Sequence, residues 1–278
     1  MSNPSAKSSK LKSILSMLVI PIAYIMGWTF WTFVLGNPDN FTNGDTSLNP
    51  LPASEVGALN HYMGVMYHGG FVVPFLLCTL FTAIIFSIER AITIRRSKGT
   101  GSIEEFIQKI RTLMMKGDVE SARKECEKQR GSIANVVNAG LTVYSQMEQD
   151  KNLDKERKLL AIQKELEEAT TLELPMLSKN LMIISTIASV ATLLGLFGTV
   201  LGMIRAFSAL AQAGAPDAVA LSTGISEALI NTALGVITSA IAIIMYNTFT
   251  SRIDNITYGI DEAGYTLVQS FNARIKHD

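Results

Sequence analysis

A single carboxylate stands inside a long apolar stretch near the C-terminal end of the sequence. Glu227 lies in the segment GISEALINTALG, residues 224–235, and it is the only charged residue between Asp217 and Arg252. Placing an ionised carboxylate at the centre of a membrane costs about 2.5 to 3.5 kcal/mol even on a lenient scale. Burial disfavours the charged form of an acid, so a glutamate here is suited to take up and release a cation. We therefore expect Glu227 to serve an ion pathway.

Small and polar residues share the helical face of Glu227. Asn231 follows one turn later and would point to the same side, where it is placed to hydrogen-bond the carboxylate or to help coordinate a cation. A second small-residue face, in the preceding apolar run, contains Thr199 and the G-x-x-x-G motif of Gly198 and Gly202. Small faces let membrane helices approach closely. The glycines that we expect to pack the two helices are Gly195, Gly198, Gly202, Gly224 and Gly235.

The same residues also fit a purely structural interpretation. Glu227 would then be hydrogen-bonded across a packing seam without moving an ion. Serine and threonine hydroxyls are often satisfied by carbonyl groups of their own helix. On spacing alone, Thr199 and Thr232 therefore favour packing over conduction.

Other kinds of chemistry have little support. The segment GLFGTVLG is glycine-rich but lacks the G-K-[ST] of a phosphate-binding loop. No histidine lies in an apolar run, so a nucleophilic serine would have no base. Cys78 and Cys126 are far apart and belong to no metal-binding pattern. We expect neither an enzyme nor a bound cofactor or metal, only a translocated H⁺ or Na⁺.

The composition and four apolar runs predict an all-α, polytopic membrane protein. Of the 278 residues, 48% are hydrophobic and 17% are charged, whereas about a quarter are charged in an average soluble domain. The expected organisation is a cytoplasmic N-terminus (1–12), a first span (13–35), a periplasmic loop (36–69), a second span (70–90), a cytoplasmic helical region (91–180), a third span (181–212), a periplasmic turn (213–221), a fourth span (222–248) and a cytoplasmic C-terminal helix (249–278).

Lysine and arginine residues indicate the orientation of these spans. Cytoplasmic flanks of spans are enriched in positive charge. Lys and Arg are absent from the segment 36–69 and from the turn 213–221, while the region 91–180 holds most of them. Both termini are therefore expected in the cytoplasm. The net charge is zero and no long basic stripe is present, which argues against nucleic acid as a partner.

The region between the second and third spans reads as a set of amphipathic helices. Ser102 and Glu105 have the spacing of a capping box, and Gly117, Gly131 and the stretch 148–152 are expected to break the region into short helices. From Leu153 towards residue 210 no strong stop occurs apart from Pro175. The pattern predicts one helix that runs from the cytoplasm into the membrane.

Two sequence blocks resemble a known family. The blocks are LLGLFGTVLGMIRAF, residues 193–207, and GISEALINTALG, which continues to MYN at 245–247. Together they resemble the MotA/TolQ/ExbB proton-channel proteins, with the closest similarity to the ExbB/TolQ branch. The first span is extra compared with the three-helix pattern of ExbB and TolQ, and Asn231 stands where that family often has alanine.

The resemblance implies a function and partners. By position, Glu227, Thr199 and Thr232 match residues that line the ion path in the family. It further implies a homopentamer in the bacterial inner membrane, with the third and fourth helices around a central pore. The pore would hold a two-copy ExbD/TolR-like single-span protein with a membrane aspartate, and work would pass to a TonB- or TolA-like protein. An ion-coupled secondary transporter and a structural membrane scaffold are the alternatives, and H⁺ against Na⁺ stays open.

Overall fold

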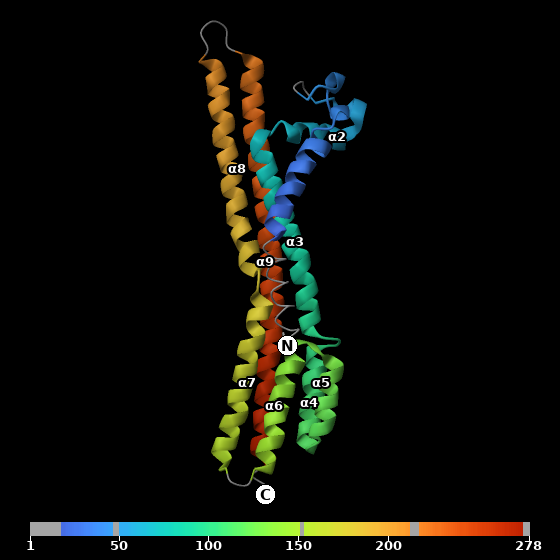
Figure 1. Ribbon diagram of the computed structural model, residues 1–278, viewed down its shortest axis with the longest axis vertical. Coiled ribbons are helices and arrows are strands. Elements are labelled where there is room, and N and C mark those ends of the chain that lie inside the picture. Colours follow the sequence, from blue (N-terminus) through green and yellow to red (C-terminus); the bar gives the residue numbers. More distant parts are fainter. Residues whose placement is uncertain (1–17, 47–49, 151–152, 212–216, 275–278) are drawn as a thin grey trace, which may run out of the picture. The chain divides into compact units, whose positions relative to one another are not determined.

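The protein is helical throughout the part of the chain that its computed structural model describes, residues 18–46, 50–150, 153–211 and 217–274 (Figure 1). Within those ranges there is no β-strand, only an isolated bridge between Phe41 and Pro50. The all-α prediction is confirmed. The chain divides into two compact units. The first comprises Met1–Ser87 and Ile183–Met245, and the second comprises Ile88–Met182 and Tyr246–Asp278.

Four helical stretches are long and apolar enough to cross a membrane, which confirms the prediction of four spans. The first is Leu18–Leu35; its last six residues form the π-helix η1 (Phe30–Leu35). The predicted N-terminus (1–12) and the start of the first span (13–17) lie outside the described residues. A chain with four such stretches is a multi-pass membrane protein.

The segment between the first two spans is more ordered than the predicted loop. It contains the short 3₁₀ turns η2 (Pro38–Asn40) and η3 (Thr42–Gly44), and the helix α2 (Ala53–Tyr67). Pro52 precedes α2 in an extended conformation, as expected for a residue that starts a helix but cannot continue one. A kink at Gly57, with φ 81° and ψ 158°, is open only to glycine. Because the kink interrupts the helical spacing, the sequence pattern does not predict α2.

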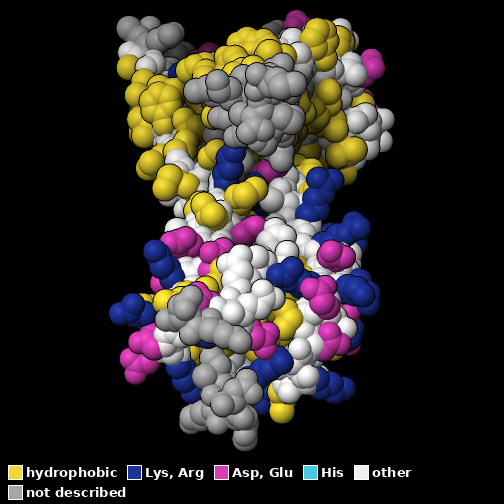
Figure 2. Space-filling model, turned by 60° about the horizontal axis from the view of Figure 1, so that its bottom comes forward, with side chains coloured by type: hydrophobic (Ala, Val, Ile, Leu, Met, Phe, Trp, Pro, Cys, Tyr) yellow, Lys and Arg dark blue, Asp and Glu magenta, His cyan; other side chains and the backbone are white. Residues whose placement is uncertain are grey.

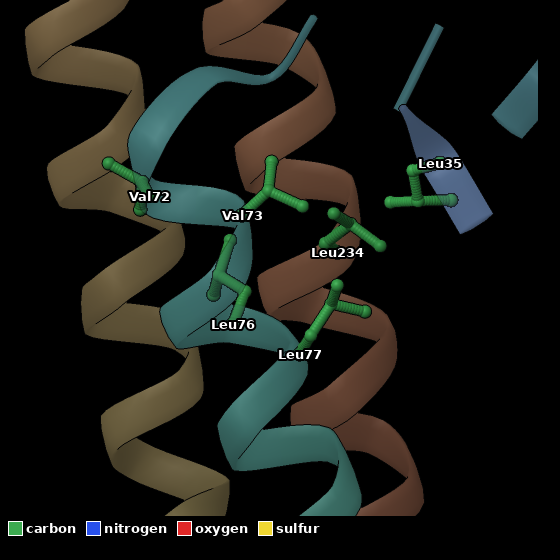
Figure 3. Close-up of a cluster of buried hydrophobic side chains, with 6 residues drawn as sticks. All are labelled: Leu35, Val72, Val73, Leu76, Leu77 and Leu234. Atoms are coloured by element: carbon green, nitrogen blue, oxygen red, sulfur yellow. The ribbon is translucent and has the colours of Figure 1, made fainter. Parts of the chain in front are cut away.

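Apolar side chains from several helices form the core of the first unit. The turn η4 (Gly70–Val72) leads into α3 (Val73–Lys98), and the cluster in Figure 3 joins this corner to η1 and α9. Its buried members are Leu35, Val72, Val73, Leu76, Leu77 and Leu234. The first span lies directly on α3, because a methyl group added to Gly27 would stand 2.9 Å from the carbonyl oxygen of Pro74. The first span therefore packs against α3.

Four amphipathic helices, together with the ends of α3 and α9, build the second unit. They are α4 (Ile103–Lys116), α5 (Val119–Gln129), α6 (Gly131–Gln149) and α7 (Lys155–Ser178). Ser102 is the N-cap of α4, and its hydroxyl accepts a hydrogen bond from the backbone N–H of Glu105. Gly117 ends α4 in a left-handed conformation, and α6 starts at Gly131. These predicted helix ends are confirmed. In the view of Figure 2, charged side chains gather over this unit and hydrophobic ones over the first.

The predicted continuous helix from Leu153 to residue 210 is wrong, because the chain breaks at Lys179 and Asn180. α7 ends at Ser178 and α8 (Leu181–Leu210) begins three residues later. Asn180 has a φ of 64°, a left-handed conformation that asparagine adopts more readily than most residues. Buried Arg90 donates to the carbonyl groups of Met176 and Leu177, each at 3.4 Å, and so satisfies the end of α7. A contact this distant in sequence is invisible to local patterns.

The last helix is a single long element. α9 (Ala218–Arg274) has 57 residues, whereas a span needs about 20. It includes the predicted fourth span (222–248) and the C-terminal helix (249–278) as far as Arg274, together with the end of the predicted turn (213–221). Residues 212–216 and 275–278 lie outside the described part.

Candidate ion site

α8 and the first part of α9 are antiparallel neighbours whose backbones nearly touch (Figure 1). A methyl group added to Gly202 would lie 2.7 Å from the backbone nitrogen of Ala228, and one added to Gly224 would lie 2.7 Å from that of Ala206. Gly195 and Gly235 face each other in the same way, and Gly198 makes room for the side chain of Asn231. All five glycines proposed for helix packing therefore lie along this approach. Small residues are what permits it.

Glu227 is buried within the first unit and is paired with an arginine. Its side chain extends from α9, and the residue is 3% exposed. Nη1 of Arg205, on α8, lies 2.6 Å from Oε1 and 2.6 Å from Oε2 of Glu227. The side chain of Arg205 is itself 56% exposed. The carboxylate is thus enclosed, while its counter-charge reaches it from a more open position.

The turn at the start of α3 forms a third wall of the site. Gly70 has a φ of 77°, and a methyl group there would lie 2.2 Å from Oε1 of Glu227. The nearest atom of another residue is Nη1 of Arg205, 3.4 Å from the same position. Only a glycine both adopts this φ without strain and leaves room for the carboxylate. Glu227 therefore stands where α3, α8 and α9 meet.

Asn231 connects this turn to α9. It is fully buried, and its Nδ2 donates a 2.8 Å hydrogen bond to the carbonyl oxygen of Gly69. Its Oδ1 has no hydrogen-bond partner in the described chain. The expected hydrogen bond from Asn231 to the Glu227 carboxylate is therefore absent from this structure. The side chain instead fixes the backbone beside Glu227 and presents one unsatisfied acceptor.

Thr199 and Thr232 form a second polar pair, on α8 and α9. Their hydroxyl groups contact each other. Thr199 also donates to the carbonyl oxygen of Gly195 at 3.1 Å, and Thr232 donates to that of Ala228 at 3.2 Å. Thr199 borders an open hollow of about 630 Å³ on α8. The structure brings the two threonines together, but no hydrogen bond in the described chain joins them to Glu227.

Arg205, Gly69 and Gly70 are site residues that the sequence patterns did not single out. Arg205 had a usable signal, since it is the only Lys or Arg between Lys179 and Arg252. An ionisable residue in a spanning helix is a functional candidate by default. Gly69 and Gly70 carried no such signal, because their role depends on contacts with residues far along the chain.

The residues around Glu227 form a site that is suited to bind one cation at a buried carboxylate. Within the described residues, no group of three or more His, Cys, Asp or Glu side chains is placed to hold a metal ion. His61 lies outside the site, where Nδ1 is 2.7 Å from the carbonyl oxygen of Leu51. Charge exchange at Glu227 is the chemistry that the geometry offers.

Comparison with known proteins points in the same direction. Residues 127–262 match the model of the MotA/TolQ/ExbB proton channel family. The Tol-Pal system protein TolQ of Pseudomonas aeruginosa is 30% identical over 120 residues, covering 43% of this chain and 52% of that protein. TolQ of Haemophilus influenzae is 39% identical over 94 residues, 32% of this chain and 41% of that one.

The ExbB branch is represented as well. The biopolymer transport protein ExbB of Pseudomonas putida is 30% identical over 101 residues, covering 36% of this chain and 31% of that protein. The chain thus spans between about a third and a half of the length of the three relatives. Both motif blocks, α8 and the first part of α9 lie inside the matched region, whereas α3 lies outside it.

Proposed function

We propose that this chain is a subunit of an ion-driven motor, because residues 127–262 belong to the MotA/TolQ/ExbB proton channel family and resemble ExbB and TolQ. In this proposal the subunit couples the flow of H⁺ or Na⁺ to mechanical work. The work is delivered to a TonB- or TolA-like protein that acts at the outer membrane. No enzymatic step is involved.

The burial of Glu227 is the observation that carries the proposal. It is the only acidic residue in the described part of the first unit that is both buried and on a spanning helix. Moving one elementary charge through the membrane potential yields about 2.3 kcal/mol per 100 mV. This energy biases a conformational step when two states of the protein bind the ion differently. Glu227 is where the ion would be bound.

The outer surface of α8 supports an assembly around a partner. Several large apolar side chains of α8 are half exposed or more: Leu193, Leu196, Phe197, Val200, Ile204 and Phe207. Val200, Ile204 and Phe207 also line the hollow that Thr199 borders, so the surface is suited to contact other helices or lipid. We place here the neighbouring copies of a homopentamer and an ExbD/TolR-like single-span protein with a membrane aspartate. Thr199, Thr232 and Asn231 would line or support the ion pathway.

The location follows from the same proposal. The subunit would lie in the bacterial inner membrane with both termini in the cytoplasm. The first unit would then contain the spans, and the second unit, with most of the Lys and Arg residues, would face the cytoplasm.

The ion pair of Glu227 with Arg205 favours one competing function, a structural scaffold. A buried carboxylate held at 2.6 Å by a guanidinium fits a structural role in a helix bundle, because removing one member of such a pair destabilises the protein. The scaffold predicts that neutralising Glu227 lowers stability and leaves ion-dependent function intact. The motor predicts the reverse.

The experiment that separates the two is Glu227→Gln in cells that express the variant from the native locus. The glutamine keeps the shape and hydrogen-bonding capacity of the side chain. The motor proposal expects normal amounts of the oligomer, co-purification of a single-span partner, and complete loss of the energised function. Full function in the Gln variant would contradict the motor proposal. Solute transport by the purified chain without any partner would instead support the secondary transporter.

A further inference from the structure

Arg205 contacts Glu227, the one buried carboxylate in the described part of the first unit. In the described part of that unit, Arg205 is the only Lys or Arg residue. The other acidic residues there belong to the exposed segments: Asp39, Asp45, Glu55 and Asp217. A lone pair of opposite charges in an apolar bundle neutralises itself, which lowers the cost of placing either charge there. A transported ion therefore has to compete with Arg205 for the same carboxylate.

Arg205 contacts the Glu227 carboxylate through one nitrogen, as a compact cation would. Arginine and carboxylate groups frequently meet through two parallel hydrogen bonds that involve two nitrogens. Here a single nitrogen, Nη1, lies at the same distance of 2.6 Å from both oxygens of Glu227. Neither Nε nor Nη2 of Arg205 has a hydrogen-bond partner in the described chain. The arginine therefore occupies the position that a cation bound by both oxygens would take.

The two partners also differ in how firmly they are held. Glu227 is enclosed by Gly70 and by the α8–α9 approach, whereas the side chain of Arg205 is 56% exposed. A long, half-exposed arginine side chain has many alternative rotamers, and fixing it in one of them costs conformational entropy. The carboxylate is thus the stationary group and the guanidinium is the group that is free to leave.

We propose that Arg205 is a positioning residue that acts as a tethered counter-cation. In the subunit it holds the Glu227 carboxylate ionised and closed to ions, and an ion binds only after the guanidinium has moved away. This inference rests on the proposed function for its biological meaning, since it assigns a gate to the same ion site. Its physical content, competition between Arg205 and a proton for Glu227, is testable without any partner protein.

The consequence of removing Arg205 follows from charge balance. A buried carboxylate without its counter-charge is strongly disfavoured and takes up a proton instead. Charge-assisted hydrogen bonds of this kind contribute enough free energy to change a protonation equilibrium by roughly tenfold or more. Arg205→Gln therefore removes the group that competes with a proton for Glu227, and it leaves the place for a cation vacant.

Labelling with N,N′-dicyclohexylcarbodiimide reports this change directly. A protonated carboxyl group adds across one C=N bond of the reagent, and the adduct rearranges to a stable N-acylurea without losing atoms. The full-length protein in native membranes would be labelled, and the peptide that contains Glu227 quantified by mass spectrometry. We expect labelling of Arg205→Gln to be faster than that of the wild type by roughly tenfold or more. Equal rates in the two proteins would overturn the proposal.

Two variants serve as controls. Glu227→Gln must abolish labelling of this peptide. Arg252→Gln removes the next basic residue in the sequence after Arg205. Arg252 lies on α9 and forms no ion pair within the residues that the structure describes, so this variant should label like the wild type. An equal increase in Arg252→Gln would show that loss of any nearby positive charge has this effect, and would contradict a specific role of Arg205.

The reciprocal measurement covers the case in which Arg205→Gln does not fold. Phenylglyoxal modifies free guanidinium groups, and Arg205 should react faster in Glu227→Gln than in the wild type. An unchanged rate would contradict the pairing. Neither labelling result depends on motor function. A labelling difference together with full activity of Glu227→Gln would uphold the ion pair and defeat the motor, whereas no labelling difference together with an inactive Glu227→Gln would defeat the counter-cation alone.

Discussion

Gly70 lies directly against the carboxylate of Glu227, so closely that a methyl group on Gly70 would stand 2.2 Å from Oε1. The two residues are 157 positions apart in a sequence of 278. The start of α3 is therefore shaped around the acid on α9. This contact closes one side of the candidate ion site, and it makes the site sensitive to changes in a helix that contributes no charge to it.

Gly70→Ala is expected to damage the ion site more than it damages the fold. Alanine in the left-handed conformation costs about 1 to 2 kcal/mol, and here its methyl group also displaces the carboxylate. The matched control is Gly44→Ala, since Gly44 has a φ of 70° but the nearest atom to its added methyl group is 3.6 Å away. Both variants should show lower apparent melting temperatures in detergent, and Gly70→Ala alone should lose ion-dependent function. Equal functional loss in both would refute the contact.

Gly202→Ala is expected to push α8 and α9 apart. Its methyl group would meet the backbone nitrogen of Ala228 at 2.7 Å, and overpacking of this kind typically costs about 1 to 3 kcal/mol. The control is Gly264→Ala, another glycine within a helix, where the nearest atom is 3.5 Å away. There alanine should be neutral or stabilising by about 1 kcal/mol, because of its higher helix propensity. Apparent melting temperatures of both variants test the difference, and a Gly202 variant as stable as the wild type would contradict the close approach.

The elements that depend on residues close together in the sequence were predictable from the sequence. Uniform apolarity revealed the four spans, and the Ser102 cap and the breaks at Gly117 and Gly131 were identified by local chemistry. The end of α7 was not predictable, because it depends on Arg90 from another helix. α2 was missed because a glycine kink interrupts its spacing.

The candidate site likewise has a part that local sequence patterns predict and a part that depends on contacts between helices. The rarity of an acid in a spanning run was enough to select Glu227, and small-residue spacing was enough to select the glycines of α8 and α9. The enclosure of Glu227 by Gly70 and its pairing with Arg205 are three-dimensional facts. They depend on how α3 and α8 approach α9, and no spacing within one helix encodes them.

Arg90→Ala is expected to loosen the end of α7. Arg90 is 2% exposed and contacts Glu89, the carbonyl oxygen of Met176 and that of Leu177. Its loss leaves acceptors unsatisfied, at about 1 to 3 kcal/mol. Arg96→Ala, at an exposed position of the same helix, is the control. Hydrogen exchange should accelerate in the last turn of α7 in the Arg90 variant only. Unchanged exchange there would show that Arg90 does not cap this helix.

The thiol of Cys126 is expected to be inert in the folded protein. It is 4% exposed, and burial, followed by the charge of Glu125, raises its pKa from 9.0 to about 12. The thiolate is the reactive form, so the folded chain at pH 8 holds on the order of a thousandfold less of it than a free cysteine does. A Cys78→Ser variant, which isolates Cys126, should react with N-ethylmaleimide only after unfolding. Rapid reaction of the native variant would contradict the burial.

The same shift has a defined effect on stability. A group whose pKa is raised on folding favours the folded state below its unfolded pKa, and this contribution is lost as the pH rises through the folded value. For Cys126 the loss falls between about pH 9 and pH 12. Replacing Cys126 with Ala in the Cys78→Ser background should reduce the loss of apparent stability across this range, as measured by thermal unfolding. An unchanged pH dependence would show that the thiol does not contribute.

The central claim is that Glu227 takes up and releases the transported ion, and ion flux through the purified complex tests it most directly. The complex of this chain with its co-purified single-span partner would be reconstituted into liposomes, and H⁺ or Na⁺ entry measured under an imposed membrane potential. We expect flux in the wild-type complex and none above that of empty liposomes in Glu227→Gln, with the same oligomer and the same partner bound. Equal flux in the two complexes would contradict the claim.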